Sequence, residues 1–591
     1  MTCANCYLWV RTFVVLTFLS FLGSTSAYCE SATGESVVLL FNGKIVTVDS
    51  NFSIAEAMAV HGEKILAVGS LAEVRKACEE TGKPVEQIDL AGRTVLPGLI
   101  DTHAHPPGAS VFEFDHPVPQ MDSIEDVLAY VRQRAAVLPE GSWIGIQQVF
   151  ITRLRERRYP TRAELDAAAP RHPVVFRTGP DAVLNSLALQ ICGIDRNFEI
   201  RDGLPGKIER DPVTGEPTGV LRNCSRFIKY KPSEKSPDFE DRVTALRQLL
   251  AGYNEVGITS VVDRSVSESS IKLYQTLLER GQLTCRVFLT FYVNAQGPWE
   301  NIEERVKFAR NHPLRQYNSW LWLRGIKFFL DGGMLTGSAY MKKPWGVSAI
   351  YSIDDPEYRG VLFVEPEPLA RLVRFILEND LQPTAHCVGD GAVETLVQAY
   401  VQAADAVPLR EKRPCLSHAN FMTPEAIELM AKHGIVADMQ PIWLYLDGQT
   451  LREHFGEERL RYFQPYRTLF DKGVIVAGGS DHMQKIGRRR SINSYDPFLG
   501  MWTALRRIPK HSSTPLHPEE ALTREEVIRL YTINGAYLTF EEHIKGSLEP
   551  GKLADFIILD RDILTCPVDE IADTVVLETW VGGKRVFRAN P

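Results

Sequence analysis

Eight short apolar segments alternate with helical patterns along the middle of this chain, and this alternation restricts its fold more than any other feature. Patterns typical of amphipathic helices lie between most of the segments, for example Phe239–Glu255 and Pro366–Glu378. Eight strands alternating with helices predict an α/β fold, the (β/α)8 TIM barrel. The strand candidates, in chain order, are Thr94–His103, Ile258–Asp263, Cys285–Val293, Leu323–Asp331, Pro383–Cys387, Pro414–His418, Gly434–Gln440 and Gly473–Asp481.

A long insertion separates the first strand candidate from the second. It covers about residues 107–237 and is rich in Pro, Arg and Asp. An insertion after the C-terminal end of a barrel strand lies over the face where such barrels carry their active sites. We therefore interpret this segment as a cap on the substrate side.

Short strand patterns also occur at both ends of the chain. Val37–Val48 indicates two strands around an Asn-Gly turn, and Val575–Phe587 indicates a hairpin around Gly-Gly. We predict one composite β-sandwich domain from residues 28–93 and 543–591, beside a barrel domain at 94–542. The alternative is two separate edge hairpins.

The first residues have the pattern of a secretory signal peptide. Arg11 precedes the apolar run Thr12–Leu22, and small residues follow up to Ala27. We predict a signal peptide at 1–27, and export to the periplasm, the medium or a eukaryotic secretory pathway. The run is shorter than the about 20 residues that span a membrane, so the mature chain is expected to have no membrane span. An uncleaved anchor stays open.

The charge balance excludes one class of partner. The 591 residues include 66 Lys and Arg and 74 Asp and Glu, a net charge of −8, without a long run of either sign. Nucleic-acid-binding proteins usually show a basic excess or a concentrated basic patch. We therefore expect no nucleic acid and a small-molecule substrate as the partner, while a homodimer stays open.

Six residues able to bind metal fall at the C-terminal ends of the predicted strands. His103 and His105 are two positions apart, so both imidazoles can face the same side of a strand. Their strands are the first, fourth, fifth, sixth and eighth, whose ends meet at the active mouth of a barrel. Imidazole and carboxylate ligands are typical of zinc and related metals. The six residues are His103, His105, Lys327, His386, His418 and Asp481. Taken singly, each is also compatible with a structural role.

Lys327 needs an account of its own. It lies among apolar neighbours, where an unpaired ammonium group is costly. Two interpretations stay open at this point: Asp331 pairs with it, or the side chain is carboxylated and has become an anion.

Five segments resemble motifs of the amidohydrolase superfamily. The resemblance covers nearly all of residues 37–590 and is closest to the amidohydrolase-3 branch, which contains N-substituted formamide deformylase. The matching segments are Pro97–His105, Ile326–Gly332, His386–Asp390, Met439–Pro441 and Gly546–Asp555.

This resemblance implies a metal-dependent hydrolase with one or two divalent ions, zinc being expected. One ion would take His103, His105 and Asp481, and a second would take His386 and His418. Carboxylated Lys327 would bridge the two. A metal-activated hydroxide would attack the carbonyl carbon of an amide, an N-substituted formamide or a cyclic imide. Asp481 would be the catalytic acid–base group.

The sequence departs from the family pattern inside the cap. Relatives usually carry Asp-Gly-His-Ala where Gly179–Ala182 stands, and a Trp-Asp element where Gln147–Phe150 stands. Asp181 could therefore favour a cationic or hydrogen-bond-donating substrate, or be a drifted loop residue. Arg488, after strand eight, could reach a substrate carboxylate or belong to a solvated loop. With Asp331, these are the candidate substrate-binding residues.

Two rival functions stay open. The same site could open an ester or lactone or catalyse an isomerisation, and the barrel could be a non-catalytic binding protein. The presence of all six ligand candidates argues against the second rival, because a scaffold that binds no metal has no need of them.

Overall fold

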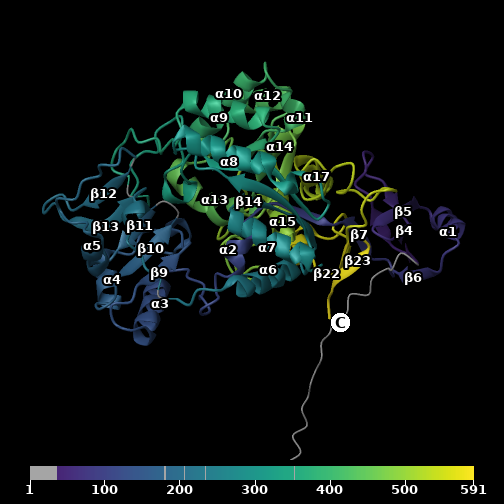
Figure 1. Cartoon of the computed structure of the whole chain (residues 1–591), viewed down its shortest axis with the longest axis horizontal. Helices are drawn as coiled ribbons and strands as arrows, with labels where there is room; N and C mark the ends of the chain where they lie inside the picture. Colours follow the sequence, from purple (N-terminus) through teal and green to yellow (C-terminus); the bar gives the residue numbers. More distant parts are fainter. Residues whose placement is uncertain (1–35, 179–180, 205, 233, 352, 591) are drawn as a thin grey trace, which may run out of the picture.

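Three parts follow one another along the longest axis of the computed structural model (Figure 1). The cap lies at one end, the barrel in the middle, and the sheets built from the chain ends at the other end. The structure describes residues 36–590 except 179–180, 205, 233 and 352. The predicted signal peptide, residues 1–27, lies outside the described residues.

The predicted barrel strands form one parallel sheet whose order follows the chain. They are β8 (Leu99–Ala104), β14 (Ile258–Val266), β15 (Arg286–Tyr292), β16 (Leu321–Phe329), β17 (Gln382–Cys387), β18 (Cys415–His418), β19 (Val436–Met439) and β20 (Val476–Gly478). The barrel closes just beyond β20, where Ala104 forms a bridge with His482. There the Asp481 N–H also donates to the His103 carbonyl over 2.7 Å. The predicted barrel is confirmed.

The predicted first strand is two strands, because the chain changes sheets at Gly98. Thr94–Pro97 forms β7, which pairs with strands of the small domain, and only β8 enters the barrel. A Cβ at Gly98 would lie 2.2 Å from Oγ1 of Thr259 on β14, so the close passage between the two sheets requires glycine. A barrel domain that begins at residue 94 therefore includes one strand too many.

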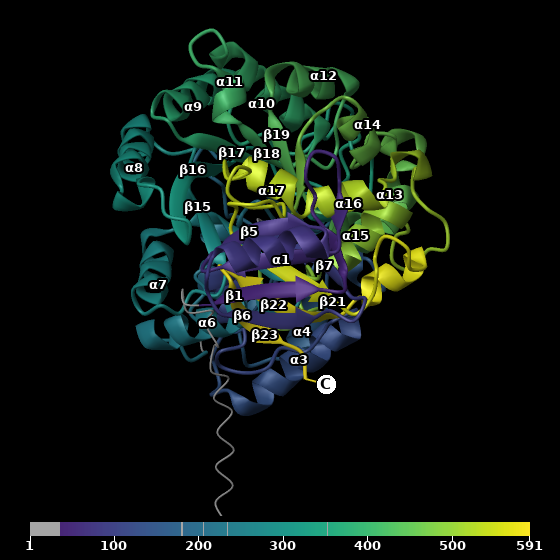
Figure 2. The ribbon, with the colours of Figure 1, turned by 90° about the vertical axis from the view of Figure 1, so that its right-hand side faces the viewer.

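Strands from both chain ends share one six-stranded sheet, in the order β23-β22-β21-β7-β2-β3. Figure 2 shows the N-terminal strands (purple) beside the C-terminal strands (yellow). This sheet comprises β2 (Lys44–Val46), β3 (Ile54–Ala55), β7, β21 (Phe556–Leu559), β22 (Val576–Val581) and β23 (Lys584–Arg588). A second, four-stranded sheet comprises β1 (Val37–Phe41), β4 (Ala57–His61), β5 (Lys64–Gly69) and β6 (Val85–Asp89). Helix α1 (Leu71–Glu80) packs against this second sheet. Leu40 from one sheet and Trp580 from the other lie in a common buried core. The predicted composite β-sandwich is confirmed.

Helices follow most barrel strands. Two of them match their predicted ranges closely: the pattern at Phe239–Glu255 forms α6, which Asp238 caps by accepting from the Asp241 N–H, and Pro366–Glu378 forms α9. The helices are α6 (Phe239–Asn254), α7 (Glu268–Glu279), α8 (Trp299–Asn311), α9, α10 (Asp390–Ala403), α11 (Leu409–Lys412), α12 (Pro424–His433), α13 (Pro441–Phe455), α14 (Tyr466–Asp471), α15 (Pro497–Arg506), α16 (Arg524–Leu530) and α17 (Ile533–Leu538). In the described part of the chain, none has the length and apolarity to cross a membrane.

The cap insertion folds around a sheet of its own, in the order β12-β13-β11-β10-β9. Its elements are α2 (Pro106–Ser110), α3 (Ile124–Val137), β9 (Ile144–Gln147), η1 (Ile151–Arg153), α4 (Arg162–Ala168), β10 (Val174–Thr178), β11 (Asp181–Leu184), α5 (Ser186–Cys192), β12 (Lys207–Arg210), β13 (Pro217–Arg222) and η2 (Ser225–Phe227). Ile151 and Phe176 of the cap share a buried cluster with Met334 and Trp443, which follow the C-terminal ends of β16 and β19. The cap therefore covers the mouth of the barrel.

Candidate metal centre

His103, His105 and Asp481 lie together at the seam where the barrel closes. Their ligand atoms all lie within 4.8 Å of one another. Asp481 Oδ1 is 3.3 Å from Nε2 of His105 and 3.6 Å from Nε2 of His103. His103 and Asp481 are buried, and the His105 side chain is 30% exposed. This group can hold one divalent ion with one side open.

Two further predicted ligands lie next to this group. His386 is on β17 and His418 ends β18. The ring centroid of His418 is 4.6 Å from that of His103 and 4.5 Å from that of His386. The structure therefore brings four imidazoles and one carboxylate to one mouth, from β8, β17, β18 and the segment after β20.

Lys327, on β16, is buried, and within the described residues its Nζ has no hydrogen-bond partner. Burial, together with the charge of Arg264, lowers its pKa to about 8, although the carboxylates of Asp438 and Asp481 oppose the change. A buried amine for which no hydrogen bond is found, beside the histidines predicted to bind metal, is the position expected for a group that is modified or bound when the site is complete.

The predicted pairing of Lys327 with Asp331 is wrong. The Asp331 carboxylate accepts the backbone N–H groups of Tyr340, Val388 and Gly389 at 2.9–3.0 Å. These bonds tie the loop after β16 to the loop after β17. Asp331 is therefore committed to holding two loops and has no free oxygen for substrate.

In the structure, Asp181 and Arg488 both have partners within the protein. Asp181 is buried inside the cap, where Oδ2 accepts from Arg222 at 2.8 Å and Oδ1 accepts the Asn223 N–H at 2.8 Å. Arg488 pairs with Asp496 at 2.6 Å and donates to the carbonyl of Thr574, next to η7 (Val568–Asp573). A sequence pattern cannot show that such charges already have partners.

Two residues that hold the histidines were not predicted as part of the site. Asp438 Oδ1 is 2.7 Å from Nδ1 of His103, and Gln440 Oε1 is 2.8 Å from Nδ1 of His418. Each contact fixes the ring and leaves Nε2 for a metal, the usual function of such partners. The signal was present in the sequence, since both are polar residues of the predicted apolar strand Gly434–Gln440.

Asp101 fixes the seam from the other side. It accepts from Ser480 Oγ at 2.5 Å and from the backbone N–H groups of Ser480 and His103 at 3.0 Å. Asp481 follows Ser480 in the chain and has a positive φ of 55°, and His418 also has a positive φ, of 74°. Left-handed backbone at residues other than glycine is uncommon and gathers at functional sites.

The electrostatics of the site suit a metal. Burial, with the positive charges of neighbouring groups, lowers the pKa of His103 and His418 well below the usual value and that of His386 to about 3. These imidazoles are neutral and can coordinate. Burial is the largest single effect on His105 and lowers its pKa, but the hydrogen bond to Asp481 and the negative charges of Asp481 and Asp263 together raise it. Neutral imidazoles, a carboxylate and an unpartnered amine fit a divalent metal centre.

The protein is a (β/α)8 barrel with histidines and an aspartate at the C-terminal ends of its strands, an arrangement typical of barrels that bind a metal ion there. The sequence matches the model of the Amidohydrolase family over residues 86–587, and the chain belongs to that family.

Similar proteins span nearly the whole chain. N-substituted formamide deformylase of Arthrobacter pascens is 30% identical over 92% of this chain and 97% of its own length. Protein LONG AFTER FAR-RED 3 of Arabidopsis thaliana is 29% identical over 93% and 91%. The putative amidohydrolase YtcJ of Bacillus subtilis is 28% identical over 93% and 99%.

Among solved structures, an uncharacterized metal-dependent hydrolase from Pyrococcus furiosus aligns with a TM-score of 0.63 and 23% identity. The alignment covers 90% of this chain and all of that one. The likeness shows the same fold.

Proposed function

We propose that the protein is a metal-dependent hydrolase of a non-peptide carbon–nitrogen bond in an amide, an N-substituted formamide or a cyclic imide. The observation that carries the proposal is the gathering of four imidazoles and Asp481 at one barrel mouth, with the unpartnered Nζ of Lys327 in the same mouth. The 30% identity to a formamide deformylase supports the choice of bond.

The ligand set divides into two groups. His103, His105 and Asp481 would hold one divalent ion, and His386 with His418 would hold a second, for which zinc is the proposed metal. When bound, such an ion supplies a water of lowered pKa and polarises the carbonyl group under attack.

Asp481 is the proposed acid–base group. Its backbone carbonyl accepts from Asn493 Nδ2 at 2.8 Å, and its Oδ1 faces the two imidazoles of β8 and its following residue. The carboxylate is therefore held in one place. There it would accept a proton from the attacking water and deliver it to the leaving nitrogen.

Lys327 is proposed to be carboxylated and to bridge the two ligand groups. Its neutral amine would add to carbon dioxide and release one proton, giving a carbamate anion on Nζ. A pKa lowered to about 8 increases the fraction of neutral amine. The product replaces a buried cation without a partner by an anion among metal ligands.

The test combines metal analysis with a hydrolysis panel. Purified protein should contain a divalent ion, cleave amides, formamides or cyclic imides, lose activity with a chelator and regain it with zinc. Asp481→Asn should be inactive, and the exposed control Glu411→Gln should be unaffected. Protein without any bound divalent ion would contradict the proposal, and faster cleavage of matched esters would assign the site to esters or lactones.

We also propose that residues 1–27 are removed on export. The apolar run Thr12–Leu22 and the small residues before Tyr28 support this. N-terminal sequencing of the natural protein should begin at Tyr28, and a natural protein that retains the leader would contradict cleavage.

A further inference from the structure

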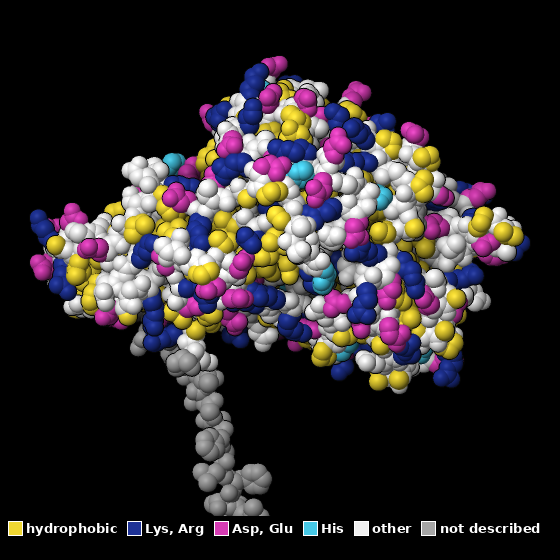
Figure 3. Space-filling model, turned by 180° about the vertical axis from the view of Figure 1, so that it is seen from behind, with side chains coloured by type: hydrophobic (Ala, Val, Ile, Leu, Met, Phe, Trp, Pro, Cys, Tyr) yellow, Lys and Arg dark blue, Asp and Glu magenta, His cyan; other side chains and the backbone are white. Residues whose placement is uncertain are grey.

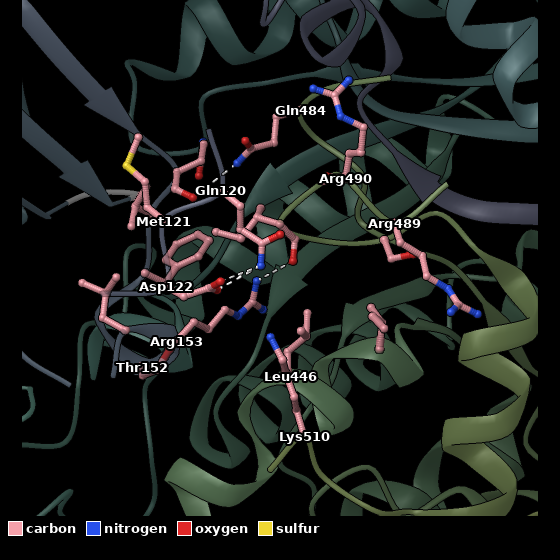
Figure 4. A pocket seen from close by; sticks show the side chains of 18 of the residues that line it. Gln120, Met121, Asp122, Thr152, Arg153, Leu446, Gln484, Arg489, Arg490 and Lys510 are labelled. Atoms are coloured by element: carbon pink, nitrogen blue, oxygen red, sulfur yellow. Dashed lines mark hydrogen bonds between the residues drawn. The ribbon is translucent and has the colours of Figure 1, made fainter. Parts of the chain in front are cut away.

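A pocket of about 720 Å³ lies between the cap and the barrel (Figure 4). The cap provides Gln148, Phe150 and Arg153, and the barrel provides residues of α13, the segment after β20 and Lys510. Figure 4 shows Arg153 and Lys510 reaching into the pocket from different sides. This volume falls within the range of small-molecule sites.

The pocket wall lies one residue from the metal centre. Arg153 donates to Oδ1 of Asn493 at 3.0 Å, and Nδ2 of Asn493 contacts the carbonyl of Asp481 at 2.8 Å. On another wall, Ile442 precedes Trp443, whose ring stacks on His418 with centroids 4.8 Å apart. None of the six ligand candidates lines the pocket itself; a single residue, Asn493, lies between Arg153 on its wall and the backbone carbonyl of Asp481.

The pocket lining is strongly cationic. Among the described residues it contains seven Arg and Lys side chains and one carboxylate, that of Asp122. This contrasts with the whole chain, whose net charge is −8, and with the face in Figure 3, where side chains of both signs are mixed. A cleft lined by one sign of charge attracts ligands of the opposite sign.

Four of the seven cations already have carboxylate partners. These pairs are Arg153 with Asp447, Arg157 with Glu453, Arg489 with Asp496, and Arg490 with Glu113. Among the described residues, Arg155, Lys485 and Lys510 have no such partner. The positive charge available to a ligand therefore comes from these three.

Of the three, Lys485 gives the strongest argument for a bound anion, because it is only 6% exposed. Its Nζ donates to the carbonyl of Pro119 at 3.3 Å. The nearby Glu113 accepts from Arg490 at 2.9 Å and from the Val118 N–H at 3.0 Å, both through Oε1. A buried ammonium group with one neutral acceptor is costly unless an anion completes its environment.

We propose that this pocket binds the carboxylate of the substrate through Lys485 and Lys510, so that the substrate is an amide carrying a carboxylate away from its scissile bond. Phe150, Ile442 and Leu446 line the same pocket and would contact an apolar body between the two groups. This inference rests on the proposed hydrolysis and defines its substrate class.

Binding can be measured apart from hydrolysis. Isothermal titration of the zinc-loaded protein would compare 3-phenylpropanoate with 3-phenylpropanamide, which differ in the charged group. We expect the carboxylate to bind about tenfold or more tightly than the amide, the size of one charge-assisted hydrogen bond. The double variant Lys485→Met/Lys510→Met should remove the difference, and Lys584→Met, on β23 of the small domain, should retain it. Thermal unfolding would verify that both variants are folded.

Hydrolysis then separates this inference from the proposed function. 4-(Formamidomethyl)benzoate and N-benzylformamide share the scissile bond and differ by one carboxylate, which in the first lies across the ring from the formamide. We expect a lower KM for the first in the natural protein and equal KM values in the variant Lys485→Met/Lys510→Met. Equal binding of the two titration probes, or no binding of either, would overturn the inference. Cleavage of both formamides with equal KM would do so while leaving the hydrolase function intact, and failure to cleave any amide despite selective carboxylate binding would instead contradict the hydrolase function.

Discussion

Asp438 Oδ1 lies 2.7 Å from Nδ1 of His103, and this contact joins two residues 335 positions apart in the chain. The other oxygen of Asp438 lies 2.8 Å from Arg264 and accepts from Ser417 Oγ at 2.9 Å. Contacts on both of its oxygens hold the Asp438 carboxylate in place, and its contact with Nδ1 in turn orients the imidazole ring of His103. The position of this candidate ligand therefore depends on a residue outside the proposed ligand set.

Replacing Asp438 should weaken metal binding. Asp438→Asn keeps the shape but loses the charge that orients His103, and such changes typically lower metal affinity about 10- to 100-fold. Titration with a zinc chelator of known affinity measures the effect. Ser417→Ala is the matched control, because it removes only the bond to the other oxygen. Unchanged affinity in Asp438→Asn would refute the orienting role.

Lys327→Ala should abolish activity, because the variant lacks the amine that would be carboxylated. Short carboxylic acids such as acetate should restore part of it, since they supply an anion where the side chain has been removed. Activity with and without added acid measures both effects. A variant that retains the natural rate and metal content would exclude a bridging function.

Asp181→Asn should lower stability rather than change substrate choice. The substitution leaves the half-buried guanidinium of Arg222 with Glu209 as its remaining carboxylate partner. We expect a loss of about 2 kcal/mol in the free energy of unfolding, below the range for a fully uncompensated buried charge. Urea unfolding measures this. A changed KM with unchanged stability would restore Asp181 as a substrate contact.

Asp380 should stabilise the fold above about pH 4 and lose this effect as the pH falls. Although burial raises its pKa, the hydrogen bond from Lys412 and the charge of Arg324 lower it to about 2. Because the folded-state pKa lies below the unfolded value of about 3.9, the stabilisation disappears as the pH falls through 2.

The side chain of Asp380 is 41% exposed, so solvent screening reduces its contribution to about 1 kcal/mol. Asp380→Asn should therefore be less stable near neutral pH by that amount, and the gap should narrow in acid. Urea unfolding over a pH series measures it, and a gap independent of pH would contradict the assignment.

The sequence contained most of the barrel because strands and helices leave local patterns. Residues at the ends of apolar strands, such as His386 and His418, could be placed at one mouth without knowing any distance. Gly98 shows the limit of this reasoning: the apolar pattern runs through it, while the change of sheet depends on the nearby Thr259.

Contacts between residues far apart in the chain could not be predicted from the sequence. The pairing of Asp438 with His103 requires the barrel to be closed, and two carbonyl groups that accept from Arg488, those of Ala572 and Thr574, lie more than 80 positions away. The sequence could not show that Asp331 accepts from backbone N–H groups of two loops, because the course of a loop in space leaves no pattern in the sequence. Charges in loops can be counted from a sequence, but their neutralisation depends on the folded chain.

The seam between Ala104 and His482 joins the first strand of the barrel to the segment after its last strand. His103 and Asp481, which the proposed metal would join, come from the first strand of the barrel and from the residues after its last strand. The edge of β8 that faces away from β14 is contacted by residues after β20, near the other end of the barrel sequence. Contacts between residues so distant in sequence form slowly. Closing the barrel at this seam therefore also brings the proposed ligands of one ion together, and a bound ion would stabilise the closed barrel.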